Sequence, residues 1–315
     1  MTTDLAAAIE QLRTGPLAAR TQVDAPLGAM TTYRVGGSAA VLVTLDAPGD
    51  PVALASVLAS RSVPVVAIGR GSNVLVSDDG FDGIAVVLGA GFAEIDVDVD
   101  TGLVTCGAAA KLPVVARSTV QAGLAGFEWA VGVPGSIGGA VRMNAGGHGA
   151  EMKDAVTEVE LIDLRTGELQ RRHADHLAFA YRTSAITSTD LVLRATLQLA
   201  PGDPASGKAE MLEIVQWRRD NQPGGQNAGS VFTNPSDDSA CRLIDAAGLK
   251  GLRIGTAEVS DKHANFIQAD PEGSAADVRA LMREIVRRVA DHSGVTLHAE
   301  THLVGFDEDG TGHGD

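Results

Sequence analysis

The glycine-rich segment from Gly132 to Gly149, GVPGSIGGAVRMNAGGHG, has the residue types best suited to holding a large ligand. Glycine at this density costs backbone entropy on folding, so its presence needs a reason. It permits positive φ angles and close approach of the backbone to another group, and successive N–H groups form a concavity that binds anions. We interpret the segment as a loop whose amides contact a bulky anionic ligand. The alternatives are a tight crossing of packed elements and a mobile lid.

Two further segments are of the same kind. Gly69-Arg70-Gly71-Ser72-Asn73 follows an apolar strand pattern, and Tyr33-Arg34-Val35-Gly36-Gly37 ends in paired glycines. Neither is the G-x-G-x-x-G fingerprint that precedes a helix, so a Rossmann dinucleotide site is disfavoured. Together with the segment at 132–149, they are suited to wrapping one extended diphosphate ligand with backbone amides.

Three short motifs carry side chains that can act on a substrate. Ser230 stands between Gly229 and an apolar strand, but no histidine accompanies it in a nucleophile elbow, so a hydrolase triad is not supported. Arg182, after Tyr181, offers a fixed fork for a carboxylate or phosphate, and the alternative is a surface ion pair. Lys262-His263-Ala264-Asn265 either faces a ligand or forms a satisfied turn.

A metal site is the weakest possibility. His298, Glu300 and His302 share one face if 295–304 is a strand, and imidazole and carboxylate groups bind metals. Nothing else in the sequence completes a ligand set, so we predict no metal.

Composition limits the class of protein. A chain of 315 residues has room for two or three domains. The net charge of −15 disfavours nucleic-acid binding and means that an anionic substrate needs locally concentrated arginine and lysine. No apolar run approaches the roughly 20 residues of a membrane span, and the start of the chain does not resemble a secretory signal. Cys106 and Cys241, distant in sequence, fit a reducing cytoplasm and are expected to be buried as small hydrophobes.

Hydrophobic periodicity predicts an α+β protein of short strands and a few helices, not a regular βαβ succession. Helices are expected at 1–20, 50–60, 112–121, 209–219, 240–247 and after the Ser274 capping box. Strands are expected at 63–68, 74–76, 84–88, 94–100 with 103–107, 156–163 with 169–173, 191–199 and 295–304. A linker composition at 201–207 marks a boundary. The expected organisation is an N-terminal helix (1–28), a two-lobed domain (29–200, lobes about 29–88 and 89–200), a C-terminal domain (208–305) and a disordered tail (306–315).

Seven motifs in order resemble the UDP-N-acetylenolpyruvoylglucosamine reductase family over about residues 25–305. They are the segments 33–37, 69–73, 132–147, 181–182, 229–235 (GSVFTNP), 248–251 (GLKG) and 262–266 (KHANF). Seven ordered motifs are far more specific than any one of them.

The resemblance implies a fold, two cofactors and a reaction. Residues 29–200 would be an FAD-binding domain of the vanillyl-alcohol-oxidase (PCMH) type, followed by an α+β substrate domain. NADPH and FAD would serve the reduction of a UDP-linked enolpyruvyl sugar to UDP-N-acetylmuramate, for peptidoglycan, in the cytoplasm. The enzyme is expected to be a monomer that binds neither nucleic acid nor membrane. The rival interpretations are a flavin oxidase of the same fold, acting on an alcohol or hydroxy acid, and a non-catalytic flavin- or nucleotide-binding module.

The resemblance also assigns residues by matching positions. The catalytic residues would be Arg182, Ser230 as proton donor, and Glu300. The substrate-binding residues would be Tyr181, Asn234, Lys262, His263 and Asn265. The cofactor-binding residues would be Tyr33, Arg34, Val35, Gly36, Gly69, Arg70, Gly71, Ser72, Asn73, Gly132, Pro134, Gly135, Ser136, Gly138, Gly139, Ala140, Asn144, Ala145 and Gly146.

Three positions depart from the family pattern. Asn221 stands where relatives often have lysine, so one expected phosphate contact is either missing or supplied by Arg218 or Arg219. His148 stands where they often have an aromatic residue. No additional tyrosine-bearing loop is visible between Tyr181 and Asp190, which is typical of the subtype that lacks this loop.

Overall fold

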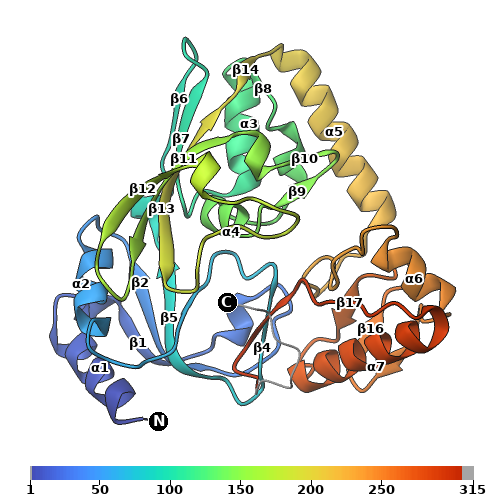
Figure 1. The fold of residues 1–315 in the computed structure, drawn as a ribbon, viewed down its shortest axis with the longest axis horizontal. Coiled ribbons are helices and arrows are strands. Elements are labelled where there is room, and N and C mark those ends of the chain that lie inside the picture. Colours follow the sequence, from blue (N-terminus) through green and yellow to red (C-terminus); the bar gives the residue numbers. More distant parts are fainter. Residues whose placement is uncertain (1, 307–315) are drawn as a thin grey trace. The chain divides into compact units, whose positions relative to one another are not determined.

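The computed structural model describes residues 2–306, which form helices and short strands in two compact units (Figure 1). Of these residues, the first unit contains 2–23, 41–70 and 83–218, and the second contains 24–40, 71–82 and 219–306. Both units are discontinuous in sequence. The α+β class is confirmed. The tail expected at 306–315 lies outside the described residues except for Phe306, which packs against the core of the second unit.

One sheet contains β1 (Thr21–Ala25), β2 (Ala39–Leu45), β5 (Phe81–Leu88) and β3 (Val65–Ala67), in that order, with β3 parallel to β5. The helices α1 (Thr3–Thr14) and α2 (Asp50–Leu58) precede and follow β2 along the chain (Figure 1). The first helix buries Leu5, Ala8 and Leu12, as the spacing predicted. It ends at Thr14 rather than near residue 20, because the Gly15-Pro16 pair cannot continue a helix.

A second, antiparallel sheet belongs wholly to the first unit. Its order is β12 (Leu169–His173), β11 (Val156–Asp163), β13 (Asp190–Gln198), β7 (Leu103–Gly107) and β6 (Ile95–Asp98). Both predicted hairpins are confirmed. The sheet shares a core with α3 (Leu112–Gln121) and α4 (Ile137–Arg142). Burial in this core, with the charge of Glu94 adding to it, raises the pKa of the Cys106 thiol to about 12. Cys241, by contrast, is only half-buried, so the expectation of burial was wrong for that residue.

The helix that ends the first unit begins earlier than predicted. α5 spans Pro204–Asn221, whereas the sequence suggested a linker at 201–207 and a helix from 209. The reason is local. The Asp203 carboxylate accepts hydrogen bonds from the Ser206 amide (2.9 Å) and hydroxyl (2.8 Å), and Pro204 suits the first turn of a helix. β8 (Leu124–Ala125) and β14 (Ala200–Pro201) pair just before this helix.

The second unit packs α6 (Ala240–Ala246) and α7 (Ala275–Ser293) with a three-stranded antiparallel sheet, β15 (Arg253–Ile254), β16 (Ala257–Val259) and β17 (Ile267–Ala269). β4 (Val74–Val76) pairs in parallel with β18 (His302–Val304). The strand expected over 295–304 is therefore regular only at its end. No helix among residues 2–306 has the length and apolar character needed to cross a bilayer.

The amino terminus of α7 is capped twice within this unit. Ser274 is the N-cap and accepts from the Ala276 and Asp277 amides, as the capping box predicted. The Asp78 carboxylate accepts from the Ser274 hydroxyl (2.7 Å) and from the Ala275 and Ala276 amides (2.9 Å each). Desolvation raises the pKa of Asp78, but these hydrogen bonds outweigh it and hold the pKa below the ordinary value of 3.8.

We expect Asp78→Asn to lower the free energy of unfolding at neutral pH by about 1 kcal/mol, since it weakens a helix cap and removes a negative charge from a helix amino terminus. Because the folded-state pKa is depressed, this stability is present above the unfolded-state pKa and is lost as the pH falls through the folded-state value. Urea unfolding of both proteins at pH 7 and near pH 3 measures the difference in free energy of unfolding between wild type and variant. A difference between wild type and variant that stays constant over this range would contradict the assignment.

Candidate active site

The glycine-rich segment in the first unit forms α4 and a tight hairpin. The hairpin pairs β9 (Gly146–Gly147) with β10 (Ala150–Glu151), and its turn places His148 and Gly149 at φ +53° and +88°. A Cβ atom added to Gly139, Gly147 or Gly149 would meet no atom within 4 Å. The backbone is therefore open at these points, as a ligand cradle requires.

The first glycine loop begins beside this segment. A Cβ atom on Gly69 would lie 2.5 Å from the Ser136 hydroxyl, so the two loops approach closely here and a side chain at Gly69 would displace that hydroxyl. The first unit contains eleven of the predicted cofactor residues besides Asn144, namely Gly69, Arg70, Gly132, Pro134, Gly135, Ser136, Gly138, Gly139, Ala140, Ala145 and Gly146.

His148, at the hairpin turn, packs edge-on against Trp217 of α5, with ring centroids 5.1 Å apart. Burial lowers the pKa of His148, and the positive charge of Arg218 lowers it further. The ring of His148 thus contacts a helix of the same unit.

Arg182 lies next to the glycine hairpin. Its guanidinium donates a hydrogen bond to the Gly146 carbonyl (3.2 Å) and lies 4.9 Å from the centre of the Tyr181 ring. A hollow of about 370 Å³ opens beside it, lined by Gly146, Gly147, Gly149, Ala150, Glu151, Lys153, Asp154 and Arg182. Sequence reasoning did not assign Glu151, Lys153 or Asp154. Their position directly after the glycine-rich segment is the feature of the sequence that could have indicated that they line the hollow.

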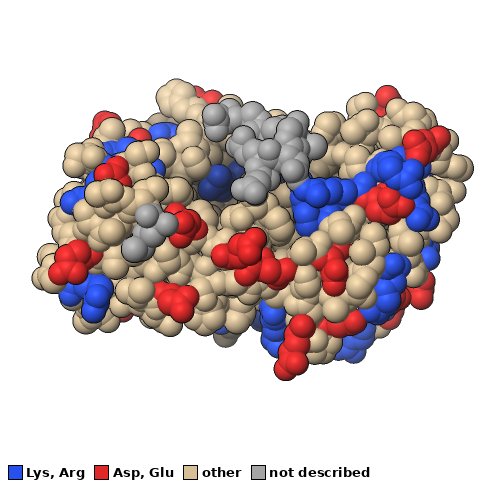
Figure 2. Space-filling model, turned by 90° about the horizontal axis from the view of Figure 1, so that it is seen from below, with Lys and Arg blue, Asp and Glu red and all other residues tan. Residues whose placement is uncertain are grey.

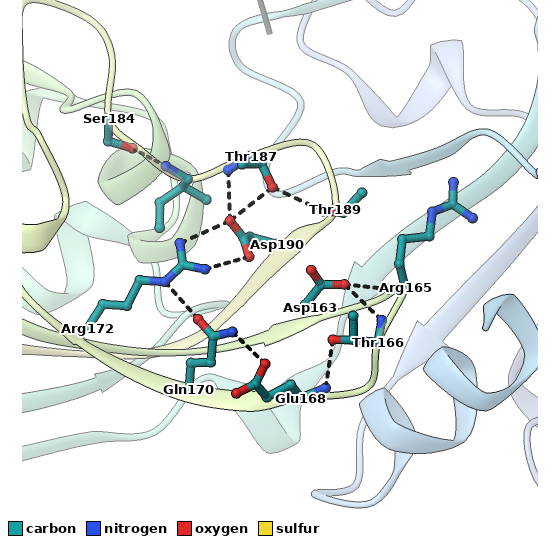
Figure 3. Close-up of polar contacts among 11 residues, drawn as sticks. Asp163, Arg165, Thr166, Glu168, Gln170, Arg172, Ser184, Thr187, Thr189 and Asp190 are labelled. Carbon is teal, nitrogen blue, oxygen red and sulfur yellow. Dashed lines mark hydrogen bonds and ion pairs between the residues drawn. The ribbon is translucent and has the colours of Figure 1, made fainter.

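The chain after Arg182 is fixed by a polar network, shown in Figure 3. The Asp190 side chain is only 2% exposed, and its carboxylate accepts a hydrogen bond from each terminal nitrogen of Arg172, both at 3.1 Å. Arg172 Nε donates to the Gln170 side chain (2.9 Å). Asp190 also accepts from the Thr187 amide (2.9 Å) and hydroxyl (3.0 Å). The start of β13 is thereby tied to β12.

Ser230 and Glu300 lie on adjacent stretches of the second unit. The Glu300 amide donates to the Val231 carbonyl (2.7 Å), and Phe232 and Ala299 form an antiparallel bridge. The Asn73 side chain donates to the Glu300 carbonyl at 3.0 Å. The stretches that carry these two residues therefore lie side by side, with Asn73, at the end of the first glycine loop, beside Glu300.

The segment Tyr33–Gly37 lies in the second unit, but its side chains do not all face outward. Tyr33 (0% exposed) and Val35 (3%) belong to the core, and burial raises the pKa of the Tyr33 phenol. Arg34, at φ +55°, is exposed. A side chain at Gly36 would collide with the Val76 carbonyl. The same unit also contains Gly71, Ser72 and Asn73, and the Thr32 amide donates to the Gly71 carbonyl (3.0 Å).

Three of the predicted substrate residues make internal bonds in the second unit. Asn265, 4% exposed, accepts from the Phe232 amide (3.0 Å) and donates to its carbonyl (2.8 Å), which fixes the strand after Ser230. Asn234 Oδ1 accepts from the Ala240 amide (3.0 Å) at the start of α6. Lys262 donates from Nζ to the Arg219 carbonyl.

His263 is also held by its neighbours. Its Nδ1 accepts from the Asn265 amide (3.3 Å), its ring lies 4.6 Å from that of Phe266, and burial lowers its pKa. Within residues 2–306, no group of three or more histidine, cysteine or acidic side chains is placed to hold a metal.

Several basic residues elsewhere are held in surface ion pairs. On the face shown in Figure 2, acidic and basic side chains are interspersed among uncharged ones. Arg253, for example, pairs with Asp270 at 2.7 Å and also with Glu258.

Comparison with known proteins identifies the two regions. Residues 39–172 match a family model described as an FAD binding domain, and residues 221–304 match one described as the C-terminal domain of UDP-N-acetylenolpyruvoylglucosamine reductase. Proteins of that name from Paramagnetospirillum magneticum and Azorhizobium caulinodans are 45% and 41% identical to this chain. The alignments cover 92% and 96% of it, and 94% and 96% of the relatives.

The crystal structure of UDP-N-acetylenolpyruvylglucosamine reductase from Thermus caldophilus has the same fold, with a TM-score of 0.76 and 34% identity. The match covers 90% of this chain and 98% of that one. An FAD-binding domain whose glycine loops leave an open cradle beside an arginine defines the chain as an FAD-dependent oxidoreductase. The chain belongs to the UDP-N-acetylenolpyruvoylglucosamine reductase family, and the resemblance seen in its motifs is confirmed.

Proposed function

We propose that this chain reduces the enolpyruvyl group of UDP-N-acetylenolpyruvoylglucosamine to give UDP-N-acetylmuramate, and that Arg182, Ser230 and Glu300 are its catalytic residues. The observation that carries the assignment is that Ser230 and Glu300 lie on adjacent stretches of the second unit, where the Glu300 amide donates to the Val231 carbonyl (2.7 Å). The Arg182 guanidinium at the edge of the glycine cradle in the first unit adds to it. Family membership over more than nine-tenths of the chain supports the reaction.

The cofactor fits the residues that would hold it. A bound FAD needs backbone that side chains do not cover, and Gly139, Gly147 and Gly149 supply this in the first unit. When bound, FAD supplies a hydride that originates from NADPH. In the second unit, Arg34 and the backbone of 71–73 are the available contacts, whereas the side chains of Tyr33 and Val35 are occupied in the core.

The chemistry requires stabilisation of charge and delivery of a proton. Adding hydride to the terminal vinyl carbon leaves negative charge on the neighbouring carbon and its carboxylate. Arg182 neutralises that carboxylate, and the acid form of Glu300 donates a hydrogen bond to it, so the charge is stabilised where it develops. Ser230 then transfers its proton to the carbanionic carbon, which is a far stronger base than an alkoxide.

We further propose that 208–305 bind the nucleotide sugar and that the enzyme works as a monomer in the cytoplasm. One chain supplies all three catalytic residues, and both cysteines are free, which fits a reducing compartment. Sedimentation velocity of the purified protein tests whether it is a monomer.

The reaction is tested with the purified holoenzyme, NADPH and the enolpyruvyl substrate in deuterated water. We expect a product with one hydrogen added to each carbon of the former double bond and with deuterium on the carbon that carries the carboxylate. Because hydrogen on the nitrogen of a reduced flavin exchanges with solvent, deuterium is expected on the other carbon as well. Oxygen consumption with an alcohol or hydroxy acid, without reduction of the enol ether, would instead identify the oxidase. Flavin binding with no turnover of either substrate would identify a binding module.

A further inference from the structure

The buried side chain of Asn144 connects the glycine segment to the chain that carries Arg182. Asn144 has no exposed surface and lies at φ +40°, a conformation that asparagine tolerates better than most residues. Its Nδ2 donates to the Ala180 carbonyl and to Glu151 Oε2, both at 2.9 Å. Its Oδ1 accepts from the Lys153 amide at 3.0 Å. Both amide hydrogens and the carbonyl oxygen are thus used inside the protein.

The partners of Asn144 are themselves fixed. Glu151 pairs through its other oxygen with Lys153, and the Glu151 amide donates to Asp154 (2.8 Å) in a capping box. The carboxamide is therefore held in one orientation by residues 151–154. Its second N–H is left to hold Ala180, two residues before Arg182.

The segment around Arg182 forms a tight turn that is bonded to the glycine segment. Ala180 and Thr183 exchange backbone hydrogen bonds of 3.1 and 3.2 Å across a turn in which Arg182 sits at φ +57°. The turn attaches to the glycine segment at Asn144, at Gly146 through Arg182 itself, and at Arg142 through the Ser184 hydroxyl (2.8 Å). Of these three bonds, the one from Asn144 has a fully buried donor. It holds the main chain at Ala180 and does not involve the Arg182 side chain.

We propose that Asn144 is a positioning residue that sets the place of the Arg182 guanidinium, and that its side chain does not contact the cofactor. This differs from the sequence-based expectation that Asn144 binds FAD. It rests on the proposed role of Arg182 in holding the substrate carboxylate. A guanidinium displaced by a fraction of an ångström stabilises the developing charge less well, while a cofactor bound by glycine amides is little affected.

Asn144→Gly is the test, because glycine adopts φ +40° without strain and the variant therefore removes only the side chain. We expect kcat to fall ~10–100-fold with a smaller change in KM. The FAD dissociation constant should change by less than about threefold, below the usual effect of losing a ligand hydrogen bond. Hydrogen exchange of the holoenzyme should accelerate over residues 180–185. Gln198→Ala removes an amide that donates to the Thr101 carbonyl (2.9 Å) in the same unit, and should change none of these.

A double-mutant cycle separates positioning from a structural role. Once Arg182→Ala has removed the guanidinium, adding Asn144→Gly should slow turnover little further. Additive losses, or weakened FAD binding with unchanged exchange at 180–185, would overturn the proposal. If Arg182→Ala alone leaves turnover intact, the proposed function of Arg182 fails and the catalytic part of this proposal with it. The exchange measurement then still decides whether Asn144 anchors the segment. Asn144→Asp, which keeps the volume and the acceptor but loses the donors, replaces the glycine variant if that does not fold.

Discussion

Replacing Ser230 by alanine is expected to slow the reduction of the enolpyruvyl substrate by ~10²–10⁴-fold, the usual effect of losing a positioned general acid. Ser230 is half-buried beside the stretch that carries Glu300, where the Val231 carbonyl accepts from the Glu300 amide (2.7 Å). Removing one hydroxyl oxygen leaves this backbone pairing in place. The effect should therefore fall on the proton that completes the product and not on the fold.

Stopped-flow absorbance of the flavin separates the two halves of the reaction. Reduction of the holoenzyme by NADPH should keep its wild-type rate in the alanine variant, and only the step that needs the enolpyruvyl substrate should slow. Ser230→Cys, which retains a proton donor of lower pKa, should recover part of the loss. Ser236→Ala, at an exposed serine bonded to Asp237, is the matched control. Equal slowing of both half-reactions would show that Ser230 acts through structure or cofactor binding.

Removing the carboxylate of Asp190 is expected to lower the free energy of unfolding by about 3–5 kcal/mol, the usual cost of leaving one member of a buried ion pair unpartnered. Asp190 is 2% exposed at its side chain and Arg172 23%, and the two form a two-bond pair at 3.1 Å. Asp190→Ala also removes the acceptor of two bonds from Thr187, which fix the chain ahead of β13 (Figure 3).

Chemical unfolding, followed by far-ultraviolet circular dichroism, measures this loss. The neighbouring Arg171 on β12 provides the control, since its side chain is 70% exposed and pairs with Glu160 at the surface. Arg171→Ala should change stability by no more than about 0.5 kcal/mol. A similar small loss for Asp190→Ala would mean that water replaces the buried pair easily and that the network in Figure 3 does not hold the segment.

Local sequence rules predicted the elements whose ends are set by neighbouring residues. α3 begins with Pro113 in its first turn and ends before Gly123 at φ +86°, so its bounds follow from the sequence alone. α5 was placed too late because Asp203-Pro204 occurs in turns as well as at helix starts. The strand at 295–304 was overextended because its first residues pair only at isolated points with 231–233.

The candidate site shows a different limit. Glycine density and the Tyr181-Arg182 pair identified segments that the structure does bring together. The direction of each polar side chain was not predictable, because a short amide serves a ligand or a backbone equally well. Asn144 and Asn265 are both buried against main-chain groups, and Tyr33 is inside the core. Such distinctions depend on contacts between residues distant in sequence, which no local pattern contains.

The parallel pairing of β4 with β18 has a consequence for biosynthesis. Val74 and His302 are partners although 228 positions separate them, and all of residues 83–218 are made in the interval. The first unit can therefore acquire its antiparallel sheet while the ribosome is still translating, whereas β4 must wait for its partner strand. Closing so long a loop is slow, which makes this last pairing the expected rate-limiting step in maturation of the nascent chain.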